Sequence, residues 1–401
     1  MTESPSQFES VRNIVLLSIA QAIGGSNQAI VMAIGALTAA SMAPSQALAT
    51  LPVTAMIIGL ALGTSPAALL IHRFGRTRGF MFGGALAIPA ALLASFSVYI
   101  ANFYLFTAAL TFVGVSASFF QQIRFAAADS VASEFKGRAI SWVMFGGVLA
   151  GFFGPQLSSI SRDWIAGAPF AAGYIVMAAL ALASIGVLSQ TRLAPPPAKG
   201  LDAYGRPLGE LLRTPEVFVP IMGATVTYAL MTLVMVAAPL AMVYACGHTP
   251  SEASGAIQWH IVAMFAPSFV TGSIIKRIGA HLTAAIGLLL IIVCAVTALN
   301  GTSVAHFDIA LILLGLGWNF GFIGSTTLLT QSYRPAEASK VQAINEQLVF
   351  GTMALASIGS GLLLQLIGWQ AINTLAIPIA AAAILLLGWA DLRRRSTAAT
   401  A

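Results

Sequence analysis

Long stretches without a charged residue or a histidine dominate the sequence. The three longest cover residues 13–71, 79–123 and 347–390. Because a helix needs about 20 apolar residues to cross a bilayer, each stretch is long enough for two membrane-spanning helices joined by a tight turn. The turns are expected at residues 41–46, 97–103 and 367–369.

Shorter apolar runs between charged or turn-forming residues add single spans. The pattern predicts twelve spans, at 14–38, 47–71, 79–99, 103–126, 139–160, 168–189, 217–243, 255–275, 281–299, 306–330, 341–364 and 368–390. A membrane β-barrel is excluded because its strands alternate in polarity over ~10 residues, whereas these runs are apolar on all sides. The predicted fold class is therefore an all-α polytopic membrane protein.

Composition and charge place this protein in a membrane and give it an orientation. Of its residues, 58% are hydrophobic and only 8% are charged, which excludes a water-soluble globular enzyme. With a cytoplasmic N-terminus, 17 of the 19 Lys and Arg fall on cytoplasmic segments. This asymmetry follows the positive-inside rule and predicts a bacterial-type inner membrane, with both termini cytoplasmic. It also explains the net charge of +6 without a nucleic-acid partner.

The predicted helices form two halves that repeat. A polar, proline-rich segment at 190–216 reads as a cytoplasmic linker between six-helix bundles at 1–189 and 217–401. A shift of 204 residues places Arg73 on Arg277 and Gly75 on Gly279, and a shift of 201 places Gly114 on Gly315. Parallel six-helix repeats are the pattern expected of an alternating-access transporter.

The segment at 73–78, its echo at 276–279 and the glycines of the fifth span resemble the loop and antiporter-type motifs of the major facilitator superfamily. The match is imperfect, because His72 and Ala150 stand where the family has Asp and Gly. The resemblance implies two pseudo-two-fold related bundles that rock around a central cavity. It also implies lipid, a small-molecule substrate and protons as partners of a monomer.

Polar side chains inside the spans are candidates for substrate binding, because a polar group in lipid is costly unless it has a partner. Spacings of three or four residues place the first group on single faces of spans one and seven, which the resemblance puts beside the cavity. This group comprises Gln21, Gln28, Thr225 and Tyr228. Hydrogen bonds between helices are the alternative role.

The second group lies on spans four and ten and comprises Gln121, Arg124, Trp318 and Asn319. A guanidinium in a wetted cavity offers a fork of donors to a carboxylate, a phosphate or a carbonyl-rich ring. Alternatively, Arg124 reaches the cytoplasmic water or pairs with Asp129. Trp318 and Trp142 are candidates for stacking on a flat solute, or they pack within the protein.

Three titratable residues are candidates for proton coupling: Glu346, His260 and Asp129. Glu346 has two possible roles. It can bind and release a proton in a medium of low dielectric constant. By analogy with the family loop, it can instead form a cytoplasmic ion pair with Arg73 or Arg76 that opens during the transport cycle.

Small residues on span five, with a proline, allow close helix packing or bending. They are Gly147, Gly151, Gly154 and Pro155. Neither metal-ligand spacing nor a clustered catalytic set occurs, so we expect no metal, no cofactor and no enzyme activity. The sequence predicts a secondary transporter of a small organic solute, with uptake of a flat vitamin such as riboflavin, or drug/proton antiport, as narrower alternatives.

Overall fold

The computed structural model describes residues 7–131, 136–193, 205–334 and 337–400, and within these ranges the regular structure is helical. The helices of the first half are α1 (Gln7–Ala40), η1 (Gln46–Leu48), α2 (Leu51–Phe74), α3 (Arg76–Tyr99), α4 (Phe103–Phe120), α5 (Ile123–Asp129), α6 (Lys136–Ile160) and α7 (Ala171–Leu188). Those of the second half are α8 (Leu208–Arg213), α9 (Pro215–Leu240), η3 (Ala241–Ala245), α10 (Pro250–Phe265), α11 (Ser268–Ile278), α12 (Ala280–Leu299), α13 (Val304–Thr330) and α14 (Ala338–Thr400).

The described residues supply twelve spans. Ten helical stretches are long and apolar enough to cross a membrane, and the pair α10 and α11, bent by 46°, adds an eleventh. The last stretch, 340–394, contains two helices, because Gly368 has φ 78° and interrupts the helical backbone. The predicted all-α fold class is confirmed, as are the turns around 41–46 and 367–369.

Two predicted spans are interrupted. The span at 103–126 divides into α4 and α5 at Gln121 and Gln122, and the span at 255–275 breaks at Pro267 between α10 and α11. Proline lacks an amide hydrogen and cannot continue the hydrogen bonding of a helix, which explains the second break. The first break has no proline, and it places Gln121 at the end of α4.

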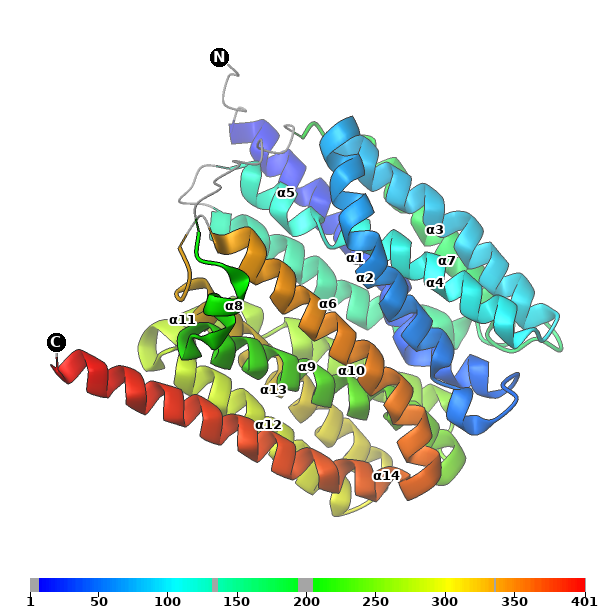
Figure 1. Ribbon diagram of the computed structural model, residues 1–401. Coiled ribbons are helices and arrows are strands. Elements are labelled where there is room, and N and C mark those ends of the chain that lie inside the picture. Colours follow the sequence, from blue (N-terminus) through cyan, green and yellow to red (C-terminus); the bar gives the residue numbers. More distant parts are fainter. Residues whose placement is uncertain (1–6, 132–135, 194–204, 335–336, 401) are drawn as a thin grey trace.

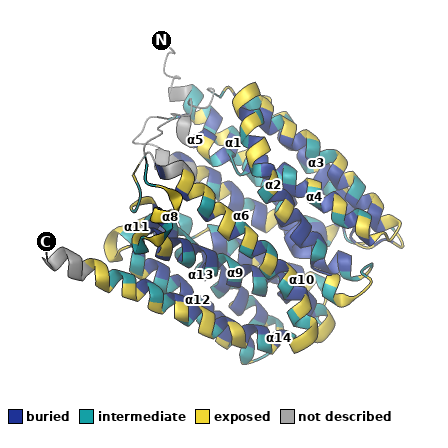
Figure 2. Ribbon diagram, in the orientation of Figure 1, coloured by how far each residue is buried: buried dark blue, intermediate teal, exposed yellow. Residues whose placement is uncertain are grey.

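The helices form two bundles, which occupy the upper right and the lower left of Figure 1. In the first bundle α1 packs along α6 and α2 along α4, and in the second α9 packs along α14 and α12 along α13. The two bundles meet where α6 contacts α10 and where α2 contacts the first part of α14. Figure 2 shows buried residues on the helix faces turned toward one another and exposed residues on the outside.

Repeat-related glycines have the same backbone conformation in both bundles. Gly75 lies between α2 and α3 with φ 87° and ψ 161°, and Gly279 lies between α11 and α12 with φ 86° and ψ 158°. Positive φ values of this kind favour glycine, because a Cβ atom is strained there. The shift of 204 residues therefore relates two turns of the same geometry.

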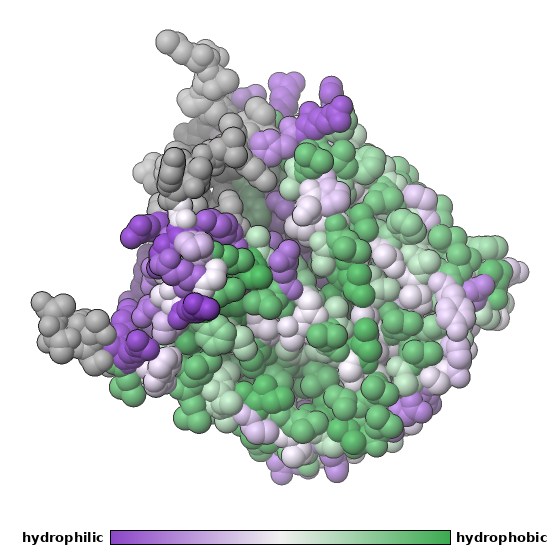
Figure 3. All heavy atoms as spheres, in the orientation of Figure 1, coloured by the Kyte–Doolittle hydropathy of each residue, from purple (hydrophilic) through white to green (hydrophobic). Residues whose placement is uncertain are grey.

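The two bundles are closed against each other at one end. Hydrophilic residues gather at the other end, which carries Arg73, Lys276 and Arg394 and which we call the basic end (Figure 3). Away from it, the Thr54 Oγ1 donates to Ser357 Oγ at 2.8 Å. There, too, Gln156 Nε2 donates to Gln258 Oε1 at 2.8 Å. These bonds join α2 to α14 and α6 to α10 near the end opposite the basic end.

An ion pair fixes the segment before α8 to the start of α14. The Arg206 guanidinium donates to both oxygens of Glu337, at 2.8 and 3.0 Å, and the Arg206 amide adds a third bond at 3.1 Å. The Arg334 amide donates a fourth at 3.0 Å, and the Glu337 side chain is fully buried. These donors hold the pKa of Glu337 well below its usual range, because they stabilise the carboxylate.

We expect Glu337→Gln to lower the melting temperature, because the neutral amide cannot replace a carboxylate that accepts four hydrogen bonds. The pKa of Glu337 is lower in the folded protein than in the unfolded chain, where it is about 4.3, so the ionised carboxylate stabilises the fold above that pH. This stabilisation is lost as the pH falls through the pKa that Glu337 has in the folded protein. The difference in melting temperature from the unmodified protein should therefore stay constant between pH 8 and about 5 and shrink below about pH 4. Glu210→Gln on exposed α8 is the control, and an equal shift for both variants would contradict the prediction.

Candidate functional site

A central cavity lies between the two bundles. Its walls come from α1, the junction of α4 and α5, and α6 on one side, and from α9, α10, α13 and α14 on the other. Six of the eight predicted substrate-binding residues line it: Gln21, Gln28, Gln121, Arg124, Tyr228 and Trp318. The structure therefore brings together polar residues predicted on spans one and four with aromatic residues predicted on spans seven and ten.

Aromatic rings form the side of the cavity contributed by the second bundle. The rings of Trp318 and Phe322 are stacked at an interplanar angle of 12°, with centroids 5.4 Å apart. Tyr228 stands edge-on to both, at 5.2 Å from Trp318 and 4.9 Å from Phe322. The indole Nε1 of Trp318 is buried and has no hydrogen-bond partner in the described structure. This wall offers a flat π surface and one N–H donor.

The opposite wall carries a positive charge. Arg124 is the second residue of α5, and its side chain is half-buried with the guanidinium 4.9 Å from the Phe125 ring. Its Nε is a second buried donor without a partner in the described residues. Arg124 and Tyr228 both line the cavity, the first from the first bundle and the second from the second bundle.

Close packing at Gly24 supports the end of α4. A Cβ atom at Gly24 would collide with the ring of Phe120, the last residue of α4. The absence of a side chain thus lets the Phe120 ring lie against α1, beside the break that presents Gln121 and Arg124 to the cavity. Gln21 and Gln28 lie one turn away from Gly24 on either side and extend the polar wall along α1.

Two predicted substrate-binding residues lie outside the cavity lining. Asn319 is fully buried, and its Nδ2 donates to the carbonyl of Met264 at 2.6 Å and to Ser268 Oγ at 2.8 Å. Its Oδ1 accepts from Thr271 at 2.6 Å. Asn319 therefore bridges the break at Pro267, where helical hydrogen bonds are lost. Thr225 is buried on α9.

The predicted coupling and gating residues are dispersed. Glu346 is exposed on the first part of α14, whereas His260 is fully buried, with Nδ1 at 2.8 Å from the carbonyl of Leu311. The Arg73 guanidinium lies 5.4 Å from the Phe74 ring, and Arg76 is buried. Asp129 ends α5, and its side chain is outside the described structure.

The small residues predicted on span five pack α6 against two neighbours. Gly151 lies against Ile261 of α10, and Gly147 lies near the Phe265 ring. Gly154 contacts α1, and the carbonyl of Pro155 accepts a hydrogen bond from Ser254 of α10 at 3.3 Å. These residues therefore lie at the contact between the bundles.

Several cavity residues had no polar signal in the sequence. They are Phe265, Phe322, Met231, Met235, Met264 and Met353. Met231 and Met235 lie three and seven residues after Tyr228, so helical spacing places them on the face of a predicted site residue. That spacing is the signal that would have found them.

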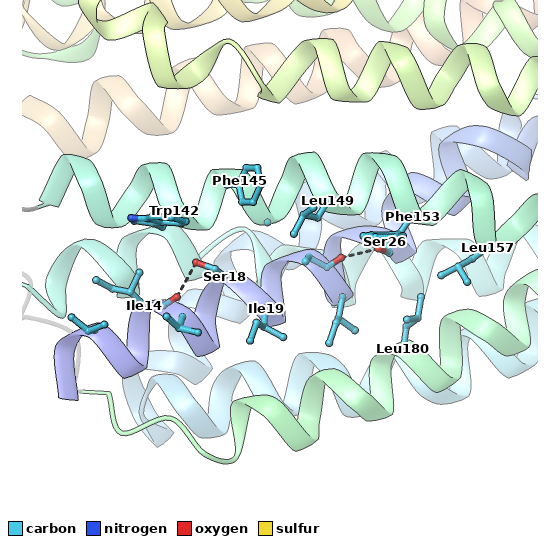
Figure 4. Close-up of a pocket in the computed structure, with 15 residues that line it drawn as sticks. Ile14, Ser18, Ile19, Ser26, Trp142, Phe145, Leu149, Phe153, Leu157 and Leu180 are labelled. Carbon is cyan, nitrogen blue, oxygen red and sulfur yellow. Dashed lines mark hydrogen bonds between the residues drawn. The ribbon is translucent and has the colours of Figure 1, made fainter. Parts of the chain in front are cut away.

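A second hollow lies on the outer side of the first bundle and is apolar. Figure 4 shows Trp142, Phe145, Leu149, Phe153 and Leu157 along α6, facing residues of α1 and Leu180 of α7. Both of its serine hydroxyls donate to carbonyls of their own helix, at 2.8 and 2.7 Å. With these hydroxyls already bonded, the groove suits hydrocarbon, and Trp142 lies here instead of in the central cavity.

The twelve spans, the two bundles and the cavity between them define a membrane transporter. A model of the Major Facilitator Superfamily matches residues 16–349 and 220–401, and the chain belongs to this superfamily.

Similarity to individual members extends over most of the chain. The chain is 46% identical over 373 residues to the riboflavin transporter RfnT of Brucella anthropi. This match covers 92% of the chain and 93% of RfnT. The chain is 31% and 28% identical to the uncharacterized MFS-type transporters YdeG and YddS of Bacillus subtilis. These matches cover 90% and 88% of this chain, and 88% and 84% of the two relatives.

Proposed function

We propose that the protein carries riboflavin into the cell across the inner membrane, as a monomer and without converting it chemically. The similarity to a riboflavin transporter over nearly the full length supports this substrate. The cavity supports it independently, because riboflavin combines a flat fused ring, two ring carbonyls and a hydroxylated tail, and it is uncharged. The aromatic wall suits the ring, and the glutamine amides of Gln21, Gln28 and Gln121 suit the carbonyls and hydroxyls.

The observation that carries the proposal is the pair of buried donors on opposite walls. A buried N–H without an acceptor costs about 1–3 kcal/mol, so such groups are expected to have a function. Trp318 Nε1 and Arg124 Nε lack partners in the described structure, and both residues line the cavity. A ligand with acceptors at its edge and a π face for the Trp318–Phe322 stack would satisfy them.

The distribution of charge and the contacts between the bundles indicate which side of the membrane the cavity faces in this structure. The positive-inside rule makes the basic end cytoplasmic, so the hydrogen bonds of Thr54 and Gln156 close the opposite, outer side. The structure then corresponds to a state that faces the cytoplasm. Opening to the outside requires these bonds to break while the bundles close over the cavity at the basic end.

Uptake of labelled riboflavin by a riboflavin-auxotrophic bacterium without its own transporter tests the proposal. Cells that express the protein should accumulate label and grow at riboflavin concentrations that do not support control cells. Unlabelled riboflavin should compete, and a flat drug cation should not. Equal uptake by both strains would contradict the substrate, and faster loss of label from preloaded cells would contradict import.

We propose that Glu346 couples uptake to protons, because it is a carboxylate on the first part of α14, the helix that also contributes Met353 to the cavity wall, and it lies within electrostatic range of Arg124. In liposomes, an inwardly directed proton gradient should accelerate riboflavin uptake by the unmodified protein. Glu346→Gln should abolish this acceleration and retain exchange of labelled for unlabelled riboflavin, which needs no net proton movement. Glu210→Gln is the control, and full acceleration in the Glu346 variant would exclude this carboxylate as the coupling group.

A further inference from the structure

A pocket separate from the central cavity opens at the basic end of the second bundle. It consists of two contiguous hollows of about 420 and 240 Å³ that share His281, Leu328, Gln331 and Arg394. Its walls are the beginnings of α9 and α12 and the ends of α13 and α14. None of the predicted transport residues lines it.

The pocket is apolar toward the membrane interior and polar at its rim. Ala285, Ile384 and Leu387 form the deeper wall, whereas Glu216, Arg393 and Arg394 lie at the rim. Nearby, Trp389 is exposed on α14, and the Arg393 guanidinium lies 5.6 Å from its ring. Exposed tryptophan next to arginine is typical of the level of the lipid headgroups. The pocket therefore extends from the level of the lipid headgroups into the hydrocarbon layer of the membrane.

The charges at the rim are balanced. Arg393 and Arg394 contribute two positive charges, and Glu216 and Asp391 contribute two negative charges. Asp391 is held by Arg394 at 3.3 Å and by His281 at 3.6 Å, whereas Glu216 is exposed and has no ion pair among the described residues. A purely anionic ligand would face two carboxylates. A headgroup with both charges matches the rim.

We propose that this pocket binds a phospholipid of the cytoplasmic leaflet whose headgroup carries a phosphate and a primary ammonium, as in phosphatidylethanolamine. The phosphate lies at Arg393 and Arg394, and the ammonium donates to Glu216. The start of an acyl chain lies on Ile384. A quaternary ammonium has no N–H to donate, and a glycerol headgroup has no cation, so both fit less well. The site does not depend on the solute that the central cavity carries.

Lipid binding to the full-length, delipidated protein in detergent tests the site. Native mass spectrometry with phosphatidylethanolamine, phosphatidylcholine and phosphatidylglycerol should give a preference of about fivefold for the first, as expected for one charge-assisted contact near the surface. Glu216→Gln should remove the preference over phosphatidylcholine and increase binding of phosphatidylglycerol. Arg394→Gln should weaken the binding of all three.

Exposed residues of α8 that lie outside the pocket provide matched controls. Glu210→Gln and Arg213→Gln make the same chemical changes and should leave lipid selectivity unchanged. Glycerophosphoethanolamine, which has the headgroup without acyl chains, should compete only weakly, because it lacks the contact with the apolar wall. Equal binding of the three lipids by the unmodified protein, full competition by the soluble headgroup, or the same selectivity in the Glu216 variant would overturn the proposal.

Discussion

Trp318→Ala is expected to raise the KM for riboflavin about 5- to 150-fold, since stacking of a flat base on an aromatic side chain contributes about 1–3 kcal/mol. Trp318 lies at the centre of the aromatic wall, with Phe322 stacked on it and Tyr228 edge-on to it. Removing the indole removes the π face and the Nε1–H donor together. The measurement is the concentration dependence of initial uptake in liposomes.

Two further variants separate these contributions. Trp318→Phe keeps an aromatic face and loses the donor, so its KM should lie between those of the alanine variant and the unmodified protein. Trp142→Ala removes the same side chain from the outer groove, where the indole is 60% exposed, and should leave the KM unchanged. An unchanged KM in a folded Trp318→Ala protein, with normal melting behaviour, would show that the substrate does not stack there.

The number and helical class of the spans could be predicted from the sequence, because the thickness of the bilayer sets how many apolar residues one span needs. The interruptions could not be predicted equally well. The break at Gln121 contains no proline, and the residue before it, Phe120, packs against Gly24, which is far away in the chain. Pro267 gave a local signal, but the bend of 46° also depends on Asn319 from another helix.

Residues of the cavity could be predicted where a polar side chain lay within a span and helical spacing placed it on the same face as other polar side chains. Gln21, Gln28 and Tyr228 fulfilled both criteria and line the cavity. A polar side chain within a span can bind a ligand or the backbone of a neighbouring helix, and its position in the sequence does not distinguish these roles. Asn319 is an example, because it was predicted to bind substrate but donates to the carbonyl of Met264. Apolar residues such as Phe322 give no signal against an apolar background.

Gly114 and Gly315, paired by the shift of 201 residues, make the same kind of contact. Gly114 on α4 lies against the backbone of α2 at Met56 and Leu60, and Gly315 on α13 lies against the backbone of α10 at His260 and Met264. In each bundle, therefore, the fourth span crosses the second at a glycine. Backbone atoms cannot change rotamer to make room, so a side chain at these crossings must separate the helices.

We expect Gly114→Ala to lower the melting temperature by about 2–4 °C, because overpacking costs about 1–3 kcal/mol and a contact with rigid backbone atoms places the cost near the upper end of that range. Gly315→Ala should behave similarly. Gly186→Ala on α7 is the control, since nothing lies within 4 Å of a Cβ atom there and alanine favours a helix. Its melting temperature should be unchanged or higher. Equal melting temperatures for all three variants would contradict the prediction that close backbone contact at these glycines stabilises the packing of the second span against the fourth.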